Sequence, residues 1–230
     1  MTHRNYEGRM VYMTDGVGET GRETFRVTVH PDGGRTLRAD CEMDDFELLR
    51  DVVLSVDELW RPIDAYVRLT LGGTLSGAAW YHFDGCRAEC HGLSGEAGPF
   101  TDVQITPQPI QSFGSHSLHN DAWFIARVRQ AGGDLNSLTG ASFTTSLSAN
   151  GGTGPALVRI GEVQLQILDL GKEVVTVPAG RFDTHHVRVE VSDVDSFDIW
   201  ATGEDCVPVR LTSDGLAQTF ELVELRGDAR

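Results

Sequence analysis

Residues 23–43 have the sequence ETFRVTVHPDGGRTLRADCEM, in which apolar and polar side chains alternate on either side of a turn. In the first run one face carries Glu23, Phe25, Val27 and Val29. In the second run one face carries Leu37, Ala39, Cys41 and Met43. The segment Pro31–Gly34 between them has turn-forming residues. A period of two is typical of a half-buried antiparallel strand, so this stretch predicts a β-hairpin.

Similar patterns continue through the chain on both sides of its middle. Strand-like runs occur at residues 63–71, 78–83, 87–93, 101–106, 156–168, 173–177, 182–191, 197–202, 207–212 and 217–225. Residues 46–56 fit a helix or a buried strand, and we favour a strand. These runs predict an all-β protein, an antiparallel lipocalin-like barrel of about 10–12 strands that removes exposed sheet edges and can enclose a cavity. We expect residues 1–230 to form a single barrel domain.

One helix is expected in the middle of the chain. From Asn120 to Gln130 the apolar residues recur at helical spacing, Asn120 or Asp121 is a suitable first residue, and Gly132 and Gly133 end the pattern. Residues 131–154 are rich in Gly, Ser, Thr and Asn, and we expect a long connection that serves as a lid or flap.

Composition excludes several classes of function. The 230 residues carry a formal net charge of −15, which opposes binding to nucleic acid or to anionic membrane surfaces. No apolar run approaches the roughly 20 residues that span a bilayer, and the first residues lack the apolar core of a signal peptide. We therefore expect a cytoplasmic protein. Four cysteines are too few for a disulfide scaffold, so most are expected to be free thiols.

Two segments near the C-terminus carry a family resemblance. Residues 177–184, VPAGRFDT, and residues 206–211, CVPVRL, resemble the closing hairpins of an uncharacterised bacterial β-barrel family that is loosely related to lipocalin-like folds. The likeness covers about the last third of the chain. It implies a barrel fold and carries no activity with it.

The densest group of ionisable and aromatic residues is segment 113–123, FGSHSLHNDAW. If the chain turns helical here, the side chains of His116, His119 and Asp121 converge. A histidine oriented by Asp121 then suits acid–base chemistry, with Trp123 packed against the substrate. Two histidines and a carboxylate also suit Zn, Fe or Mn. In a third interpretation, Asn120 or Asp121 only caps the helix and the histidines lie at the surface.

A second candidate lies on residues 80–84, WYHFD. Alternation puts Trp80 and His82 on one face of the strand and Tyr81 on the other, and one of these faces is expected to line the cavity. His82, Cys86, Cys90 and His91 form a thin zinc-like set, but their spacing is not that of structural zinc sites, and ordinary strand and turn residues are the favoured interpretation. Trp200 is a further residue that we expect at the barrel wall.

Together these observations predict a barrel that encloses a small, largely apolar molecule. The chemistry expected is cofactor-independent acid–base catalysis of the lyase, isomerase, hydratase or cyclase type, with His116, His119 or His82 moving protons. Trp80, Tyr81, Trp123 and Trp200 are the expected substrate-binding residues. Residues 151–154 precede a strand, so they are no phosphate-binding loop, and no Gly-x-Ser-x-Gly motif occurs. The alternatives are a noncatalytic carrier and a metal-dependent enzyme using His116 and His119; the sequence also leaves room for a homo-oligomer.

Overall fold

The computed structural model describes residues 2–95, 97–133, 141–148, 151–152, 154–160, 165–191 and 195–230. Within them the strands are β1 (Arg4–Thr14), β2 (Gly18–Val29), β3 (Arg35–Met43), β4 (Leu48–Val56), β5 (Pro62–Leu71), β6 (Thr74–Asp84), β7 (Arg87–Ser94), β8 (Gly98–Ile105), β9 (Ile110–Gly114), β10 (Ala141–Thr144), β11 (Val158–Ile160), β12 (Leu165–Val177), β13 (Gly180–Val191), β14 (Asp195–Thr202), β15 (Val207–Ser213) and β16 (Gln218–Gly227). The helices are the 3-10 turn η1 (Asp44–Phe46), α1 (Leu118–Ala122) and α2 (Phe124–Ala131).

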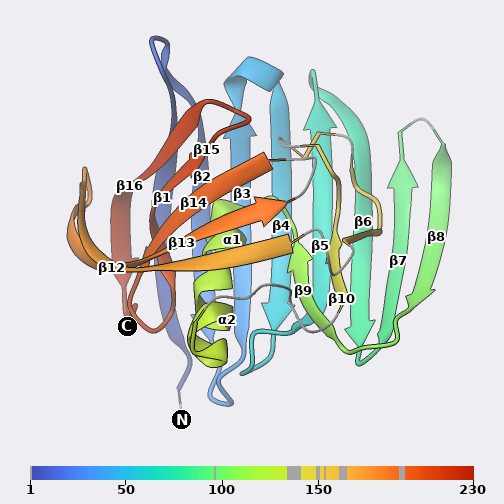
Figure 1. The fold of residues 1–230 in the computed structure, drawn as a ribbon. Helices are drawn as coiled ribbons and strands as arrows, with labels where there is room; N and C mark the ends of the chain where they lie inside the picture. Colours follow the sequence, from blue (N-terminus) through green and yellow to red (C-terminus); the bar gives the residue numbers. More distant parts are fainter. Residues whose placement is uncertain are drawn as a thin grey trace.

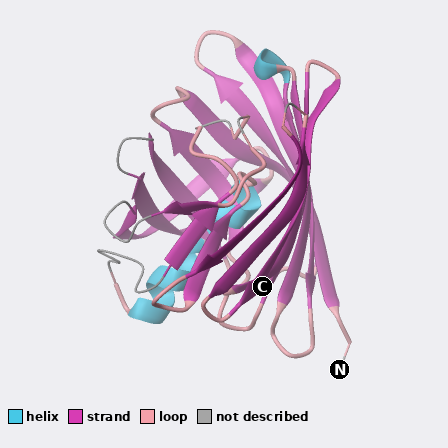
Figure 2. Ribbon diagram, turned by 90° about the vertical axis from the view of Figure 1, so that its right-hand side faces the viewer, coloured by secondary structure: helices cyan, strands magenta, loops and turns pink. Residues whose placement is uncertain are grey.

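Thirteen of these strands form one antiparallel sheet in the order β12-β13-β14-β15-β16-β1-β2-β3-β4-β5-β6-β7-β8. The pairing of β1 with both β2 and β16 joins the two ends of the chain at the centre of the sheet. Figures 1 and 2 show that the sheet curls strongly, as the twist of adjacent strands requires. The predicted all-β, antiparallel, barrel-like fold is confirmed, although the sheet stays open between its edge strands β8 and β12.

The described strands outnumber the 10–12 that the sequence predicts. Residues 4–14, which form β1, carry mixed polar and apolar side chains and were not expected to form a strand. The short strands β9, β10 and β11 form a separate sheet in which β10 runs parallel to β9. The ambiguous segment 46–56 contains β4, as favoured. Within residues 131–154, which were expected to form a lid or flap, residues 141–144 form strand β10. Residues 134–140, 149–150 and 153 lie outside the described residues.

The interior of the curled sheet is filled by the two helices. Helix α1 contacts β3 on one side and β14 and β15 on the other, and α2 contacts β12 and β13. Figure 1 shows the helices end to end, with the sheet curving round them. The helix expected at 120–130 is confirmed in place, with a break at Trp123 and an end at Gly132, whose left-handed φ of 76° suits glycine.

A buried carboxylate from the sheet fixes the start of α1. Glu23 of β2 is fully buried and accepts hydrogen bonds from the backbone N–H groups of Leu118 (2.8 Å) and His119 (3.1 Å). It also accepts the hydroxyl of Ser117 (2.9 Å) and the thiol of Cys41 (3.2 Å). A negative group at a helix start satisfies N–H groups that have no partner within the helix. Burial raises the pKa of Glu23, although these hydrogen bonds act in the opposite direction.

Apolar side chains line the concave face of the sheet, as the alternation predicts. Among the most deeply buried side chains are Tyr6, Phe25, Leu37, Leu54, Tyr81 and Ile199. Helix residues Ala122, Ile125 and Val128 are buried against them. Burying one such large side chain contributes about 1.5–3 kcal/mol, so the helices and the sheet stabilise each other through this shared core.

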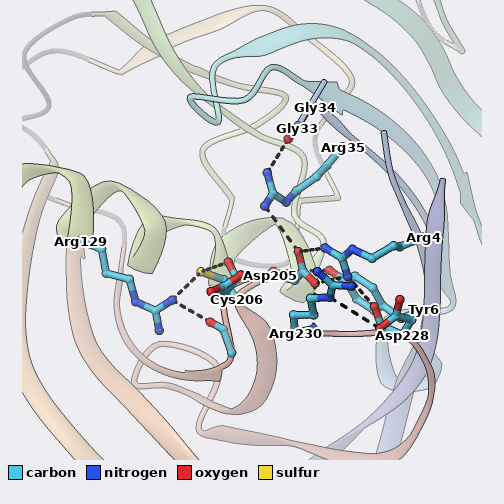
Figure 3. A network of polar contacts seen from close by, with 12 residues as sticks. Arg4, Tyr6, Gly33, Gly34, Arg35, Arg129, Asp205, Cys206, Asp228 and Arg230 are labelled. Atoms are coloured by element: carbon cyan, nitrogen blue, oxygen red, sulfur yellow. Dashed lines mark hydrogen bonds and ion pairs between the residues drawn. The ribbon is translucent and has the colours of Figure 1, made fainter. Parts of the chain in front are cut away.

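A network of ion pairs and hydrogen bonds is centred on Asp205 (Figure 3). Asp205, in the turn between β14 and β15, is fully buried and bound by both Nη atoms of Arg4, at 3.0 and 3.1 Å. Arg35 approaches the same carboxylate at 3.4 Å, and the backbone N–H of Arg230 donates to it at 2.9 Å. The network therefore fastens β1, the start of β3 and the C-terminal segment to one turn.

Because Glu23 is the partner of several buried donors, Glu23→Ala is expected to lower the free energy of unfolding by at least about 3 kcal/mol. The measurement is chemical denaturation at pH 7. Glu19→Ala, on the same strand but at an exposed position, is the matched control and should cost less than about 0.5 kcal/mol. Equal losses in the two variants would show that the carboxylate does not hold the helix.

Candidate functional site

A pocket of about 150 Å³ lies where α1 begins, between the two sides of the curled sheet. Its apolar wall comes from Tyr12, Met43, Leu118, Phe124, Phe143, Ile160, Phe197, Leu211, Leu216 and Phe220. Its polar groups include Arg50, His116, Asp121, Thr144 and Ser146. Strands from both ends of the chain, the helices and β10 thus all contribute residues to the pocket wall. Apolar walls with a few polar groups are typical of ligand sites.

The polar side is organised by Arg50 of β4. Its side chain is buried on the concave face, and its Nη1 donates to the backbone oxygen of His116 at 2.6 Å. His116 itself has a left-handed φ of 57°. A Cβ atom on Gly151 would lie 2.5 Å from Nη2 of Arg50 and 2.8 Å from Cγ of His116. The close approach of these three residues therefore requires glycine at position 151.

The imidazole of His116 lies in the wall of the pocket. Its Nε2 is 3.1 Å from the backbone oxygen of Ser146, and because that oxygen only accepts, Nε2 carries the proton. Burial and then the charge of Arg50 lower the pKa of His116 to about 3. The ring is therefore neutral at neutral pH and unsuited to act as a general acid there.

Asp121 is the pocket residue whose charge changes near neutral pH. Burial, followed by the nearby charge of Glu23, raises the pKa of Asp121 to about 7, and Arg50 acts in the opposite direction. Asp121 follows Leu118 by one helical turn, so both side chains line the pocket. A carboxyl group half-protonated near pH 7 can donate or accept a proton from a bound molecule.

His119 lies in the core and is absent from the pocket wall. It is fully buried, its Nε2 is 3.1 Å from the hydroxyl of Tyr6, and its ring meets Phe25 edge to face at 4.6 Å. Burial lowers the pKa of His119 to about 3. The expectation that His116 and His119 converge is wrong, because the left-handed backbone at His116 and the helix start at Leu118 aim their side chains in different directions. Trp123 packs against His119, 5.6 Å between ring centres, and also misses this pocket.

The predicted residues of β6 are divided between the two faces of the sheet. Trp80 and His82 lie on the outer face, where their rings stack at 5.6 Å and Trp80 is 41% exposed. Tyr81 is on the inner face, fully buried, and its hydroxyl donates to the backbone oxygen of Ala156 at 3.1 Å. His82, which was expected to move protons, and Trp80, which was expected to bind substrate, therefore do not face the interior. Cys90 is buried on the inner face as well, so the zinc-like set that includes it and His82 does not converge.

Trp200 also lies on the outer face. Its indole stacks on His186 at 4.1 Å and donates to Glu173 at 2.5 Å, while its neighbours Ile199 and Ala201 are the buried ones. Trp200 therefore does not line the cavity, contrary to the expectation. His116 and His119 do not form a metal site, because the Nε2 atom of each has a different protein partner. The described residues contain no cluster of three His, Cys, Asp or Glu that could hold a metal.

The sequence interpretation missed Glu23 and Arg50. Both carried a detectable signal, because each is a charged residue at an apolar-face position of an alternating strand. A buried charge needs partners, so such positions point to an internal polar site. Thr144 and Ser146 gave no comparable signal, because they lie in a segment whose composition indicated only a loop.

The fold and pocket together define an antiparallel, barrel-like β-domain with a helix inside it and a ligand-sized pocket at the helix start. Among solved structures the chain is similar to a β-barrel-like protein of the domain of unknown function DUF1849 from Brucella abortus. The TM-score is 0.57 at 9% identity, and 98% of each chain is covered. The likeness shows the fold.

A weaker similarity is to MucB in complex with MucA(peri), with a TM-score of 0.33, 10% identity, and coverage of 97% of this chain and 50% of that one. No family model matches the chain, and no curated protein matches it. No helix in the described ranges is long and apolar enough to cross a membrane.

The raised pKa of Asp121 predicts a pH dependence of stability. A carboxyl whose pKa in the folded protein is about 7, against an ordinary 3.8, stabilises the fold fully only below about pH 4 and loses that contribution as the pH rises through 7. Asp121→Asn removes this titration, so its stability relative to wild type should rise between pH 5 and pH 8 by about 2–3 kcal/mol.

Denaturation curves at the two pH values measure this difference. Asp15→Asn, on an exposed turn, controls for the chemical change. A constant difference between Asp121→Asn and wild type across this range would contradict the assignment.

Proposed function

We propose that this protein binds a small, largely apolar molecule in the pocket at the start of α1. The observation that carries the proposal is the pocket itself, about 150 Å³ in volume, with aromatic and aliphatic walls and the polar groups Arg50, His116 and Asp121. A core of this size is normally close-packed, so a cavity that large has a cost in stability that a bound molecule can offset.

The volume of the pocket limits the size of the ligand. Apolar cavities of about 150 Å³ bind benzene, so the buried part of the ligand has roughly six to ten non-hydrogen atoms. The polar groups favour a hydroxyl or carbonyl at one end, because Asp121 can both donate and accept near pH 7 and His116 is neutral. That the ligand is a small apolar or aromatic molecule stays a prediction, and so does the cytoplasmic location.

Binding of simple probes tests the proposal. Toluene, phenol and 1-hexanol are expected to bind with Kd values of about 10 µM to 1 mM by calorimetry. Leu216→Trp places a larger side chain in the pocket wall and should weaken binding at least about tenfold by steric exclusion.

Leu93→Trp is the matched control, because Leu93 lies outside the pocket wall and is 42% exposed. It should leave the probe affinities unchanged. Absence of binding by all three probes, or equal effects of the two substitutions, would contradict the proposal.

A second candidate function is acid–base chemistry on the bound molecule, and the observation that favours it is Asp121. Its carboxyl lies in the pocket wall and has a pKa of about 7, which suits proton transfer at neutral pH. Lyase and isomerase reactions both begin with such transfers. His119, in contrast, takes no part in this chemistry, since it is sealed in the core.

Turnover separates an enzyme from a carrier. The molecule that co-purifies with the protein, identified by mass spectrometry, is incubated with fresh protein in D2O. Catalysis gives deuterium incorporation or a product of changed mass with wild type and Asp15→Asn. Asp121→Asn should bind the molecule but slow exchange by about 10²-fold or more. Recovery of the unchanged, undeuterated molecule from wild type would establish the carrier.

A further inference from the structure

A second, smaller cavity adjoins the ligand pocket. It has a volume of about 20 Å³ and shares three wall residues with the pocket, Ser112, Gly114 and Phe124. The rest of its wall includes Leu54 and Trp60. We call this cavity the distal chamber. Phe124 has the largest side chain of the three shared wall residues.

The wall of the distal chamber includes a residue whose buried hydrogen-bond donor has no partner among the described residues. Trp123 lines it and is only 4% exposed, and within the described part of the chain its Nε1 has no hydrogen-bond partner. A buried indole N–H usually has one, because burying a polar group unpaired is costly. The indole ring is held in place by edge-to-face contacts with Trp60 at 5.5 Å and His119 at 5.6 Å. The N–H is therefore a fixed donor.

The chemistry of the chamber selects what can enter it. Indole N–H only donates, and Arg127, the charged residue in the wall, also only donates. Both ends of the Arg127 guanidinium are already engaged, by the backbone oxygen of Leu59 and by the side chain of Gln111. A volume of about 20 Å³ accepts one water-sized group. The best match is a single uncharged oxygen acceptor: a carbonyl, an ether or a hydroxyl.

We infer that the distal chamber is the far subsite of the ligand pocket and takes a terminal oxygen of the ligand as acceptor from Trp123 Nε1–H. Phe124 then sets the length that a ligand needs to reach the distal chamber. This inference rests on the proposed binding function and narrows the ligand class. The ligand has an apolar body with one oxygen near Asp121 and a second oxygen at its other end.

Pairs of probes that differ only in the second oxygen test this subsite. The 1-alkanols and α,ω-diols of five to nine carbons are titrated into wild-type protein and Trp123→Phe, which keeps an aromatic ring and removes the N–H. The quantity measured is the ratio of diol affinity to alkanol affinity at equal chain length. Loss of one hydrogen bond should lower that ratio about fivefold in Trp123→Phe.

Two further variants complete the test. Trp200→Phe makes the same change on the outer face and should leave the ratio unaltered. Phe124→Leu shortens the largest shared side chain and should shift the best-bound diol to a greater length by at least one carbon. Circular dichroism and thermal unfolding establish that each variant is folded. If Trp123→Phe does not fold, the subsite is tested on wild-type protein, where a diol must bind more tightly than the alkanol of equal length.

The outcomes separate this inference from the proposed function. If neither alkanols nor diols bind wild-type protein, the binding function fails and the subsite with it. If both bind but Trp123→Phe changes them equally, the chamber holds a structural water and only the subsite is overturned. An unchanged length preference in a folded Phe124→Leu protein likewise overturns the role of Phe124.

Discussion

The capping of α1 by Glu23 is the interaction on which the interior of this protein depends. A helix inside a curled sheet has backbone N–H groups that no water can reach, and they need an acceptor in the core. Glu23 supplies both carboxylate oxygens from β2, and binds Ser117, Leu118 and His119 at once. The sheet thus determines where α1 begins and, through that, the direction of the side chains on α1.

The pocket follows from that constraint. With the helix start fixed, Leu118 and Asp121 point into the space between the two sides of the sheet, and His119 points into the core against Tyr6. Arg50 holds the residues just before the helix by binding the backbone oxygen of His116. Two buried charges on neighbouring parts of the concave face therefore organise one loop and one helix turn. Burial is the main cause of the raised pKa of Asp121; the nearby Glu23 raises that pKa further, and Arg50 lowers it.

Two features of the curled sheet rely on contacts between residues far apart in the chain. The Asp205 network joins Arg4, Arg35 and Arg230 at one end of the sheet (Figure 3), while β1 bridges β2 and β16 at its centre. The sheet remains open between β8 and β12, and the helices fill the interior that a closed barrel would leave as a larger cavity. The pocket at the start of α1 accordingly has a volume of only about 150 Å³.

Alternation in the sequence was sufficient to predict the antiparallel β-fold and the helix near 120–130, because the periods of two and 3.6 follow directly from backbone geometry. The sequence also singled out segment 113–123, four of whose residues, Gly114, His116, Leu118 and Asp121, line the pocket. The sequence did not determine which strand face is concave, so Trp80, His82 and Trp200 were expected inside and lie outside. Nor did it pair Glu23 with Leu118 or Arg50 with His116, which are 95 and 66 positions apart. Only the curl of the sheet brings such partners together, since local periodicity contains no information about contacts across the barrel.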